Sequence, residues 1–328
     1  MTTSLHRPHA MPAAQPAVKD AAQPAVKDAA PRQGTSLPKQ PAGQVGGWEL
    51  HSLVGKGHWA RVYAARTPGA TSADYAVKVP RPLPPTSAPE CTQAIAMLQR
   101  EALIGTTVSH PHLAPVLDWQ LRGEPFLVMP LLKGCTLRTL LQHRRREHGC
   151  LLGGGKFLPQ SVWLARQVAS ALSALHWAGW LHGDVKPENV LVSPNGHGTL
   201  IDLGLARKLG SRECQGGEVL AGTLAYVSPE SFLQSATLTA ECDIYSLGVL
   251  LYELLTGQPL FEEADPTRLA LLHLRQAPAD IREAALDVPP VLARLVMQML
   301  AKEPLRRPTA GEVVERLTRL EIELLGTT

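Results

Sequence analysis

Cysteine is scarce in this sequence, and the few copies form no recognisable group. The 328 residues include five cysteines, which are widely spaced and contain no CxxC pair. An odd, scattered set of cysteines excludes a disulfide framework and supplies no ligand set for a structural zinc ion. We therefore expect a protein that folds in a reducing compartment.

Long apolar runs are also missing. The most apolar stretch, residues 245–255, is interrupted by Ser246, Gly248 and Glu253. It is well short of the roughly 20 apolar residues that a membrane-spanning helix needs. The N-terminus has no apolar core of the kind found in a secretory signal peptide. These absences predict a cytoplasmic protein with no segment inserted into a membrane.

Charge of one sign is in excess only near the N-terminus. Lys and Arg number 32 against 29 Asp and Glu, and the first 47 residues, with five basic and two acidic side chains, account for the difference. Because nucleic-acid binding uses basic residues gathered on one folded face, we expect no nucleic acid as a partner. With 45% hydrophobic and 19% charged residues, the composition is that of a globular protein and excludes wholesale disorder.

Residues 1–46 differ in composition from the rest of the chain. They are rich in Pro, Ala and Gln and contain the octapeptide AAQPAVKD twice in tandem, at residues 13–20 and 21–28. Two copies are too few for a solenoid, and a stretch with few large apolar groups cannot offset the entropy lost on ordering. We predict a disordered tail over residues 1–46, and we favour a tolerated duplication over a docking motif as the interpretation of the repeat.

The apolar pattern divides the remaining chain into a sheet-rich and a helix-rich part. Residues 48–80 contain three predicted strands, the first two joined by a glycine-rich turn, and residues 92–104 are helix-like. Beyond a short apolar strand at residues 126–129, helical spacing prevails at residues 161–178 and 244–255, and each of these helices ends next to a glycine. Between the two helices, NVLVS and TLIDL flank the turn PNGHG and predict a hairpin.

Two features of the sheet-rich part suggest a phosphate site. Gly55 and Gly57 lie in the turn GKGHWA between two predicted strands, where glycine lets backbone amides approach a phosphate closely. The turn alone is equally well explained as an ordinary β-turn, because Ala60 replaces the third glycine of the GxGxxG pattern. Lys78, late in an apolar strand that follows, makes phosphate binding the better interpretation.

The segment HGDVKPEN places an acid, a base and an amide close together. Asp184, Lys186 and Asn189 lie within six residues, after a predicted helix and before the predicted hairpin. Asp202 begins the sequence DLG at the far end of that hairpin, so the turn of the chain can bring Asn189 and Asp202 together. An amide oxygen and a carboxylate that converge there form a hard oxygen site suited to Mg²⁺. Asp184 would then face the nucleophile.

This ordered set of motifs resembles that of the eukaryotic-type (Hanks-type) serine/threonine protein kinases of bacteria. The catalytic loop is HGDVKPEN, DLG replaces DFG, and SPE at residues 228–230 replaces APE. The resemblance implies an α+β, bilobal protein-kinase-like fold. Residues 47–130 would form an N-lobe with a small antiparallel sheet and one main helix, and residues 131–325 a larger, mainly helical C-lobe.

The resemblance also implies how the phosphates of ATP would be held. Lys78, itself held by Glu101 of the predicted helix, would orient the α- and β-phosphates. Asn189 and Asp202 would bind Mg²⁺, or Mn²⁺ in its place. These roles suit a reaction in which the protein mainly positions groups and stabilises charge.

Further roles implied by the resemblance concern the acceptor side. Asp184 would be the catalytic base, Lys186 would contact the γ-phosphate, and Thr223 would hydrogen-bond near both. Arg307 would pair with Glu230 and hold the large lobe together.

A nucleotide pocket under the glycine-rich loop is implied as well. Apolar side chains would enclose the adenine, and the backbone at Pro130 and Leu132 would read its edge. The implied nucleotide-binding residues are Val54, Gly55, Gly57, Val62, Ala76, Lys78, Met129, Leu132, Asn189 and Asp202.

Two positions bear on control and specificity. Gly183 stands where many regulated kinases carry an arginine that binds a phosphate on the activation loop, so we expect activity without loop phosphorylation. Ser211 is the one hydroxyl in the segment from Asp202 to Glu230 that the resemblance gives no structural place. Glu188, in the catalytic loop, could favour basic residues before the acceptor.

The expected function is transfer of the γ-phosphate of Mg-ATP to Ser or Thr hydroxyls of protein substrates. One alternative is a pseudokinase scaffold, which would normally have lost Lys78, Asp184 or Asp202. The other is an aminoglycoside-type phosphotransferase, since HGD also occurs in small-molecule kinases. Lys186 and the segment GTLAYVSPE favour a protein substrate. Nothing in the sequence indicates an oligomeric state.

Overall fold

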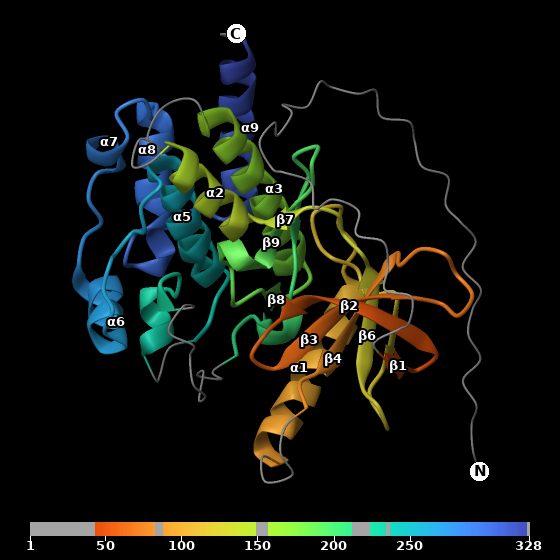
Figure 1. Ribbon diagram of the computed structural model, residues 1–328. Coiled ribbons are helices and arrows are strands. Elements are labelled where there is room, and N and C mark those ends of the chain that lie inside the picture. The colour runs from red at the N-terminus through yellow and green to blue at the C-terminus, as the bar shows by residue number, and fades with distance from the viewer. Residues whose placement is uncertain (1–42, 83–87, 149–156, 212–223, 234–236, 327–328) are drawn as a thin grey trace.

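The computed structural model describes residues 43–82, 88–148, 157–211, 224–233 and 237–326. Over these residues the chain forms a lobe built on a sheet with one long helix and a larger helical lobe (Figure 1). The expectation of an α+β, bilobal fold is therefore confirmed. None of the described helices is long and apolar enough to cross a lipid bilayer.

The N-lobe is built on one antiparallel sheet. Its strands, as far as the chain is described, pair in the order β1-β2-β3-β4-β6-β5. They are β1 (Gly43–Val45), β2 (Trp48–Lys56), β3 (Ala60–Arg66), β4 (Tyr75–Pro80), β5 (Asp118–Gln120) and β6 (Phe126–Pro130). The helix α1 (Ala88–Thr107) follows β4 and packs on the sheet through Leu98 and Leu127.

The two faces of this sheet differ in character. Residues opposite each other on neighbouring strands share a face, and the face alternates along each strand. One face carries an apolar cluster made of Val45, Leu50, Ala65, Val77, Phe126 and Val128. On the other face Val62 stands opposite Lys78, and Ala76 stands opposite Met129. This second face, which carries the lysine, is the one that borders the helical lobe.

The folded chain begins earlier than the sequence predicts. Residues 43–45 fall within the predicted disordered tail, yet they form β1, in which Val45 pairs with Trp48. Val45 is buried in the same cluster as Phe126, and a Cβ on Gly46 would collide with the Phe126 ring. A three-residue strand is too short to show a period in the sequence. The position of β1 depends on packing against Phe126, which lies about 80 residues further along the chain.

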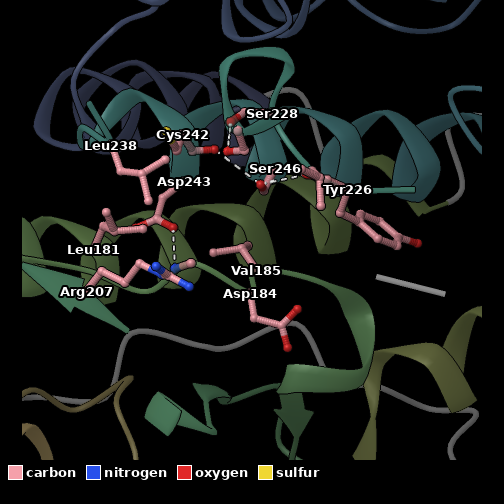
Figure 2. A pocket seen from close by; sticks show the side chains of 13 residues that line it. Leu181, Asp184, Val185, Arg207, Tyr226, Ser228, Leu238, Cys242, Asp243 and Ser246 are labelled. Atoms are coloured by element: carbon pink, nitrogen blue, oxygen red, sulfur yellow. Dashed lines mark hydrogen bonds between the residues drawn. The ribbon is translucent and has the colours of Figure 1, made fainter. Parts of the chain in front are cut away.

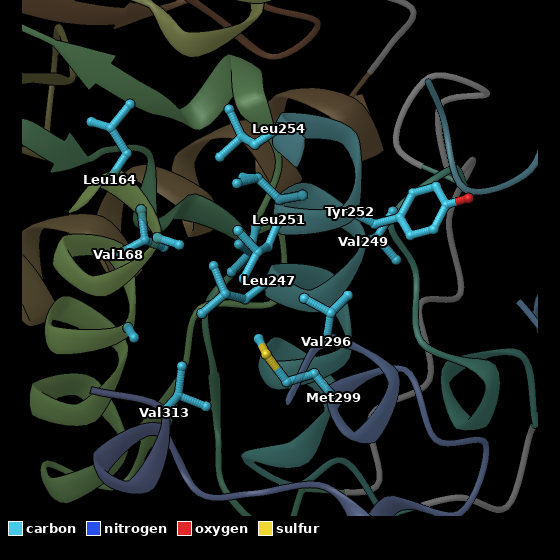
Figure 3. Packing of buried hydrophobic residues seen from close by; sticks show 14 of the residues in the cluster. Leu164, Val168, Leu247, Val249, Leu251, Tyr252, Leu254, Val296, Met299 and Val313 are labelled. Carbon is cyan, nitrogen blue, oxygen red and sulfur yellow. The ribbon is translucent and has the colours of Figure 1, made fainter. Parts of the chain in front are cut away.

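Helices make up most of the C-lobe. They are α2 (Leu137–His148), α3 (Leu158–Trp177), α5 (Glu241–Thr256), α6 (Pro266–Arg275), α7 (Ile281–Ala284), α8 (Pro290–Met299) and α9 (Ala310–Leu325). Helix α5 is buried on nearly all sides, and Leu247 and Leu251 lie between Val168 of α3 and Met299 of α8 (Figure 3). Burying a leucine contributes roughly 1.5–3 kcal/mol, so α5 is the main apolar support of this lobe.

Short strands and single 3₁₀ turns connect the helices. The strands are β7 (Cys135–Thr136), β8 (Trp180–Leu181), β9 (Val190–Val192), β10 (Gly198–Leu200) and β11 (Arg207–Lys208). The 3₁₀ turns are η3 (Pro187–Asn189), η4 (Leu203–Leu205), η5 (Pro229–Phe232) and η6 (Pro304–Arg306). Strands β9 and β10 form the hairpin that the sequence predicts, with Val190 opposite Leu200.

Candidate active site

Three charged side chains meet where the two lobes face each other. Lys78 on β4 places its Nζ 2.5 Å from Oε2 of Glu101 on α1 and 2.8 Å from Oδ1 of Asp202. Lys78 and Glu101 are both buried. The sheet, the helix α1 and the turn η4 of the C-lobe are therefore joined through one ammonium group.

The backbone of Asp202 is held in an unusual conformation. Its φ is 67°, and among the described residues it is the one non-glycine residue with a positive φ. Such a conformation costs about 1–3 kcal/mol and persists only where the surroundings impose it. Asp202 also caps η4 by accepting a hydrogen bond from the backbone N–H of Gly204. Its carboxylate is thereby turned towards Lys78.

The charges in this cluster reinforce one another. Partial desolvation disfavours the ionised carboxylate of Asp202, whose side chain is 47% exposed, but the charge and hydrogen bond of Lys78 outweigh it and hold its pKa at about 2. Burial also disfavours the ammonium of Lys78, yet Asp202 and Glu101 raise its pKa above the ordinary value. At neutral pH the cluster therefore holds a cation next to a carboxylate that can bind a metal ion.

The catalytic loop brings Asp184, Lys186 and Asn189 together. Lys186 Nζ lies 2.7 Å from Asp184 Oδ2, and Asn189 Nδ2 donates to the same oxygen at 2.7 Å. No donor of the described chain reaches Oδ1 of Asp184. Burial raises the pKa of Asp184, although the charge of Lys186 opposes it. A buried acceptor without a donor is costly. Asp184 Oδ1 is therefore free to accept one more hydrogen bond.

The hairpin β9–β10 returns the chain from Asn189 to Asp202. The backbone N–H of Ile201 donates to Asn189 O at 2.9 Å, so the two polar residues lie at the same end of the hairpin. The described chain contains no group of three or more His, Cys, Asp or Glu that could hold a metal ion alone. A divalent ion bound by Asn189 and Asp202 would need further oxygen ligands, which fits Mg²⁺ bound together with substrate phosphates.

One residue to which the sequence analysis assigns no role supports the catalytic loop. Asp243 is buried at the start of α5 and accepts hydrogen bonds from the backbone N–H groups of His182 (2.7 Å) and Gly183 (2.9 Å). The ring of His176 lies 2.9 Å from the same carboxylate. Gly183 has φ 75°, and a Cβ there would lie 2.9 Å from Leu205 O. An acidic residue within an otherwise apolar helix was the available sequence signal.

Several of the residues implied for the nucleotide lie along one face of the sheet. Gly55 pairs with Val62, Val62 with Lys78, and Ala76 with Met129, which puts these side chains on the face that carries the lysine. Val54 lies near the end of β2 and Gly57 in the turn between β2 and β3, where Gly57 N–H donates to Ala60 O at 2.9 Å.

The connector after β6 offers backbone groups to a ligand. Leu131 donates its backbone N–H to Asp74 O at 2.9 Å. Leu132 donates to no other backbone group of the described chain. Pro130 has no N–H, so a contact to an adenine edge would use its carbonyl and the backbone of Leu132.

A pocket opens beside Asp184 on the side of the SPE segment (Figure 2). It is lined by Asp184 and Val185, by Tyr226 and Ser228, and by Ser246 of α5. Ser246 Oγ donates to Tyr226 O at 2.7 Å and fixes this segment to α5. Thr223, which the sequence places near Asp184, lies outside the described residues.

The buried pair of Arg307 and Glu230 anchors the SPE segment. Arg307 Nη1 and Nη2 donate to the two carboxylate oxygens of Glu230 at 2.6 and 2.8 Å. This pairing is the one that the resemblance implied, and it joins η5 to the segment before α9.

Comparison with known proteins agrees with this arrangement. Residues 48–317 match the protein kinase domain family. The chain belongs to that family. The chain is 31% identical over 84% of its length to the serine/threonine-protein kinase PknD of Mycobacterium tuberculosis. It is 32% identical over 83% of this chain to the serine/threonine-protein kinase PknB of Mycolicibacterium smegmatis. It spans 40% and 43% of the length of these two relatives.

Proposed function

We propose that the chain transfers the γ-phosphate of Mg-ATP to serine or threonine hydroxyls of protein substrates. The observation that carries the proposal is the joined set of Lys78, Glu101 and Asp202, with contacts of 2.5 and 2.8 Å. The hairpin leads from this set to Asn189, which is bonded to Asp184. Membership of the protein kinase family and relatives named as serine/threonine kinases support the same conclusion.

The phosphate donor would be held by charge. Lys78 would lie beside the α- and β-phosphates, and Glu101 would keep its ammonium group in place. Asn189 and Asp202 would hold Mg²⁺, or Mn²⁺, which when bound neutralises charge on the phosphates. The low pKa of Asp202, about 2, keeps its carboxylate ionised for this role at any physiological pH.

The acceptor hydroxyl would be oriented by Asp184. Its carboxylate accepts the hydroxyl proton as the oxygen–phosphorus bond forms and the bond to the departing diphosphate breaks. Lys186 Nζ, 2.7 Å from that carboxylate, lies where it can balance charge on the phosphoryl group in transit. Positioning and charge stabilisation are the main contributions that phosphoryl transfer asks of a protein.

The alternatives are disfavoured by specific residues. A binding scaffold has no need of Lys78, Asp184 and Asp202 together, and all three are present with their polar contacts made. An aminoglycoside-type phosphotransferase has no need of an SPE segment that is anchored by Arg307 and lines a pocket beside the base. We therefore propose proteins as the substrates and cytoplasmic ATP as the donor. We also propose a cytoplasmic location for the kinase domain.

The test is transfer of labelled phosphate. The full chain is incubated with Mg²⁺ and γ-labelled ATP, with and without a generic protein acceptor, and labelled residues are identified. Label on Ser or Thr is expected for the wild type, reduced by about 10²–10⁴-fold in Asp184→Asn because the base is lost. Asp118→Asn, an exposed carboxylate on β5, is the matched control and should behave as wild type. ATP binding without label would indicate a scaffold, and label on an aminoglycoside alone a small-molecule kinase.

A further inference from the structure

One guanidinium group ties three parts of the acceptor side together. Arg138, in the first turn of α2, donates from Nε to Glu188 Oε1 at 2.7 Å and from Nη1 to Glu253 Oε1 at 2.7 Å. Its Nη2 donates to the hydroxyl of Tyr226. Glu188 belongs to the catalytic loop, Glu253 to α5 and Tyr226 to the segment before SPE. The guanidinium is thus bonded through each of its three nitrogens.

Each carboxylate in this cluster is paired with Arg138, Glu188 through one oxygen and Glu253 within a larger set of contacts. Glu253 is buried, and it also accepts from Arg145 Nη2 at 3.0 Å and from the Tyr226 hydroxyl. Two arginines therefore face two glutamates, and the cluster carries no net charge. Burial disfavours the charged guanidinium, but Tyr226, Glu253 and Glu188 outweigh it and raise the pKa of Arg138.

The cluster borders the place where an acceptor segment must lie. Glu188 follows Asp184 by four residues, and its side chain is 45% exposed. Tyr226 and Asp184 line the same pocket (Figure 2). An unpaired carboxylate at this position would attract a lysine or arginine of a bound peptide. The structure instead supplies that cation from within the chain.

We infer that Arg138 occupies the position that a basic side chain of a peptide substrate would otherwise take. The charges of Glu188 and Glu253 are then balanced within the chain, and the enzyme does not select basic residues near the acceptor. This inference rests on the proposed function and replaces the sequence-based expectation that Glu188 favours basic substrates. Arg138 is a specificity-determining residue because its removal leaves the exposed carboxylate of Glu188 unpaired beside the acceptor.

The experiment compares neutral peptides that contain one serine with versions in which arginine replaces alanine at one of the four positions before that serine. The ratio of kcat/KM for the arginine and alanine peptides is measured for each position. For the wild type we expect ratios within threefold of one. For Arg138→Gln we expect at least a tenfold rise at one position, and for Arg138→Gln with Glu188→Gln a return to within threefold.

A matched control isolates the position of the arginine. Arg166 on α3 has a side chain 21% exposed, close to the 23% of Arg138, and pairs at 2.8 Å with Glu321 on α9, away from the catalytic loop. Arg166→Gln should leave every ratio within threefold of the wild-type value.

Several outcomes would overturn the inference. A wild type that prefers an arginine peptide tenfold, with the preference lost in Glu188→Gln, shows that Glu188 is available after all. The inference is also refuted if Arg138→Gln folds, as judged by circular dichroism, and its kcat/KM ratios for the arginine and alanine peptides equal those of the wild type. Should Arg138→Gln fail to fold, Glu188→Gln alone decides, because the inference requires that it leave the wild-type ratios unchanged.

Peptide affinity separates this inference from the proposed function. Dissociation constants measured by fluorescence anisotropy give the same ratios without turnover. A protein that binds both peptides equally but transfers no phosphate to any acceptor refutes the proposed function and supports the inference. A protein that phosphorylates the neutral peptide but binds and phosphorylates an arginine peptide tenfold better refutes the inference alone.

Discussion

Replacing Arg307 by methionine should lower the stability of the C-lobe by far more than an ordinary surface substitution. The side chain of Arg307 is fully buried, and its guanidinium donates to both oxygens of Glu230. It also donates to the carbonyls of Ala301, Glu241 and Lys302 at 2.8, 2.9 and 3.2 Å. Methionine fills a similar volume but leaves a buried carboxylate and three carbonyls without these donors.

The expected loss follows from the burial of the pair. Removing one partner of a buried ion pair costs about 3–5 kcal/mol. Each kcal/mol lowers Tm by about 2–4 °C in a domain of this size, so Arg307→Met should melt roughly 6–20 °C below the wild type.

The neighbouring residue provides the control. Arg306 pairs with Glu303 at 2.7 Å, but the two side chains are 72% and 67% exposed. Such a surface pair contributes about 0–1 kcal/mol, so Arg306→Met should shift Tm by less than about 4 °C. Differential scanning calorimetry of both variants measures the contrast. Equal shifts in the two variants would refute the reasoning from burial.

The dependence of stability on pH tests the pair of Arg307 and Glu230 independently. Burial favours the neutral acid, but the hydrogen bonds and charge of Arg307 outweigh it and lower the pKa of Glu230 below its ordinary value of 4.5. A carboxyl group whose pKa is lowered by folding stabilises the protein above its unfolded pKa, and that contribution is lost as the pH falls through the folded pKa. The wild type should therefore lose stability more steeply than Arg307→Met as the pH falls below about 4.5.

Other perturbations give equally definite expectations. Asp202→Asn should abolish transfer from labelled ATP without altering the far-UV circular dichroism, and turnover near the wild-type rate would contradict its role in metal binding. Deleting residues 1–42 should leave Tm within about 1 °C, whereas deleting residues 1–47 removes β1 and should lower it by several degrees; equal melting curves would show that β1 contributes nothing. Ser211→Ala should keep most of the initial rate, because Gly183 has no side chain to bind a phosphate there, and a tenfold loss would show that phosphorylation is required.

The sequence indicates several residues that the fold brings together in the candidate site. Lys78, Asn189 and Asp202 stand in motifs whose order and spacing are visible along the chain, and the hairpin that joins Asn189 to Asp202 has a strong turn signal. Local patterns therefore suffice where the relevant contacts are close in sequence or are carried by a motif.

The contacts that support the catalytic loop could not be predicted from local sequence patterns. Asp243 lies about 60 residues from the backbone groups that it holds, as shown by the separations of 60 and 61 for its bonds to Gly183 and His182. Arg138 is separated by 115 residues from Glu253. Such pairs depend on how helices pack, and a single sequence carries no record of that packing.

The attachment of the catalytic loop to Asp243 has a consequence for exchange with solvent. Irregular loops usually release their amide hydrogens quickly, because local opening exposes them. The amides of His182 and Gly183 are bonded instead to a carboxylate buried at the start of the central helix. They should exchange only when α5 itself opens, as slowly as the helix interior. The backbone next to Asp184, the proposed base, would then keep its position while other parts of the chain open and close.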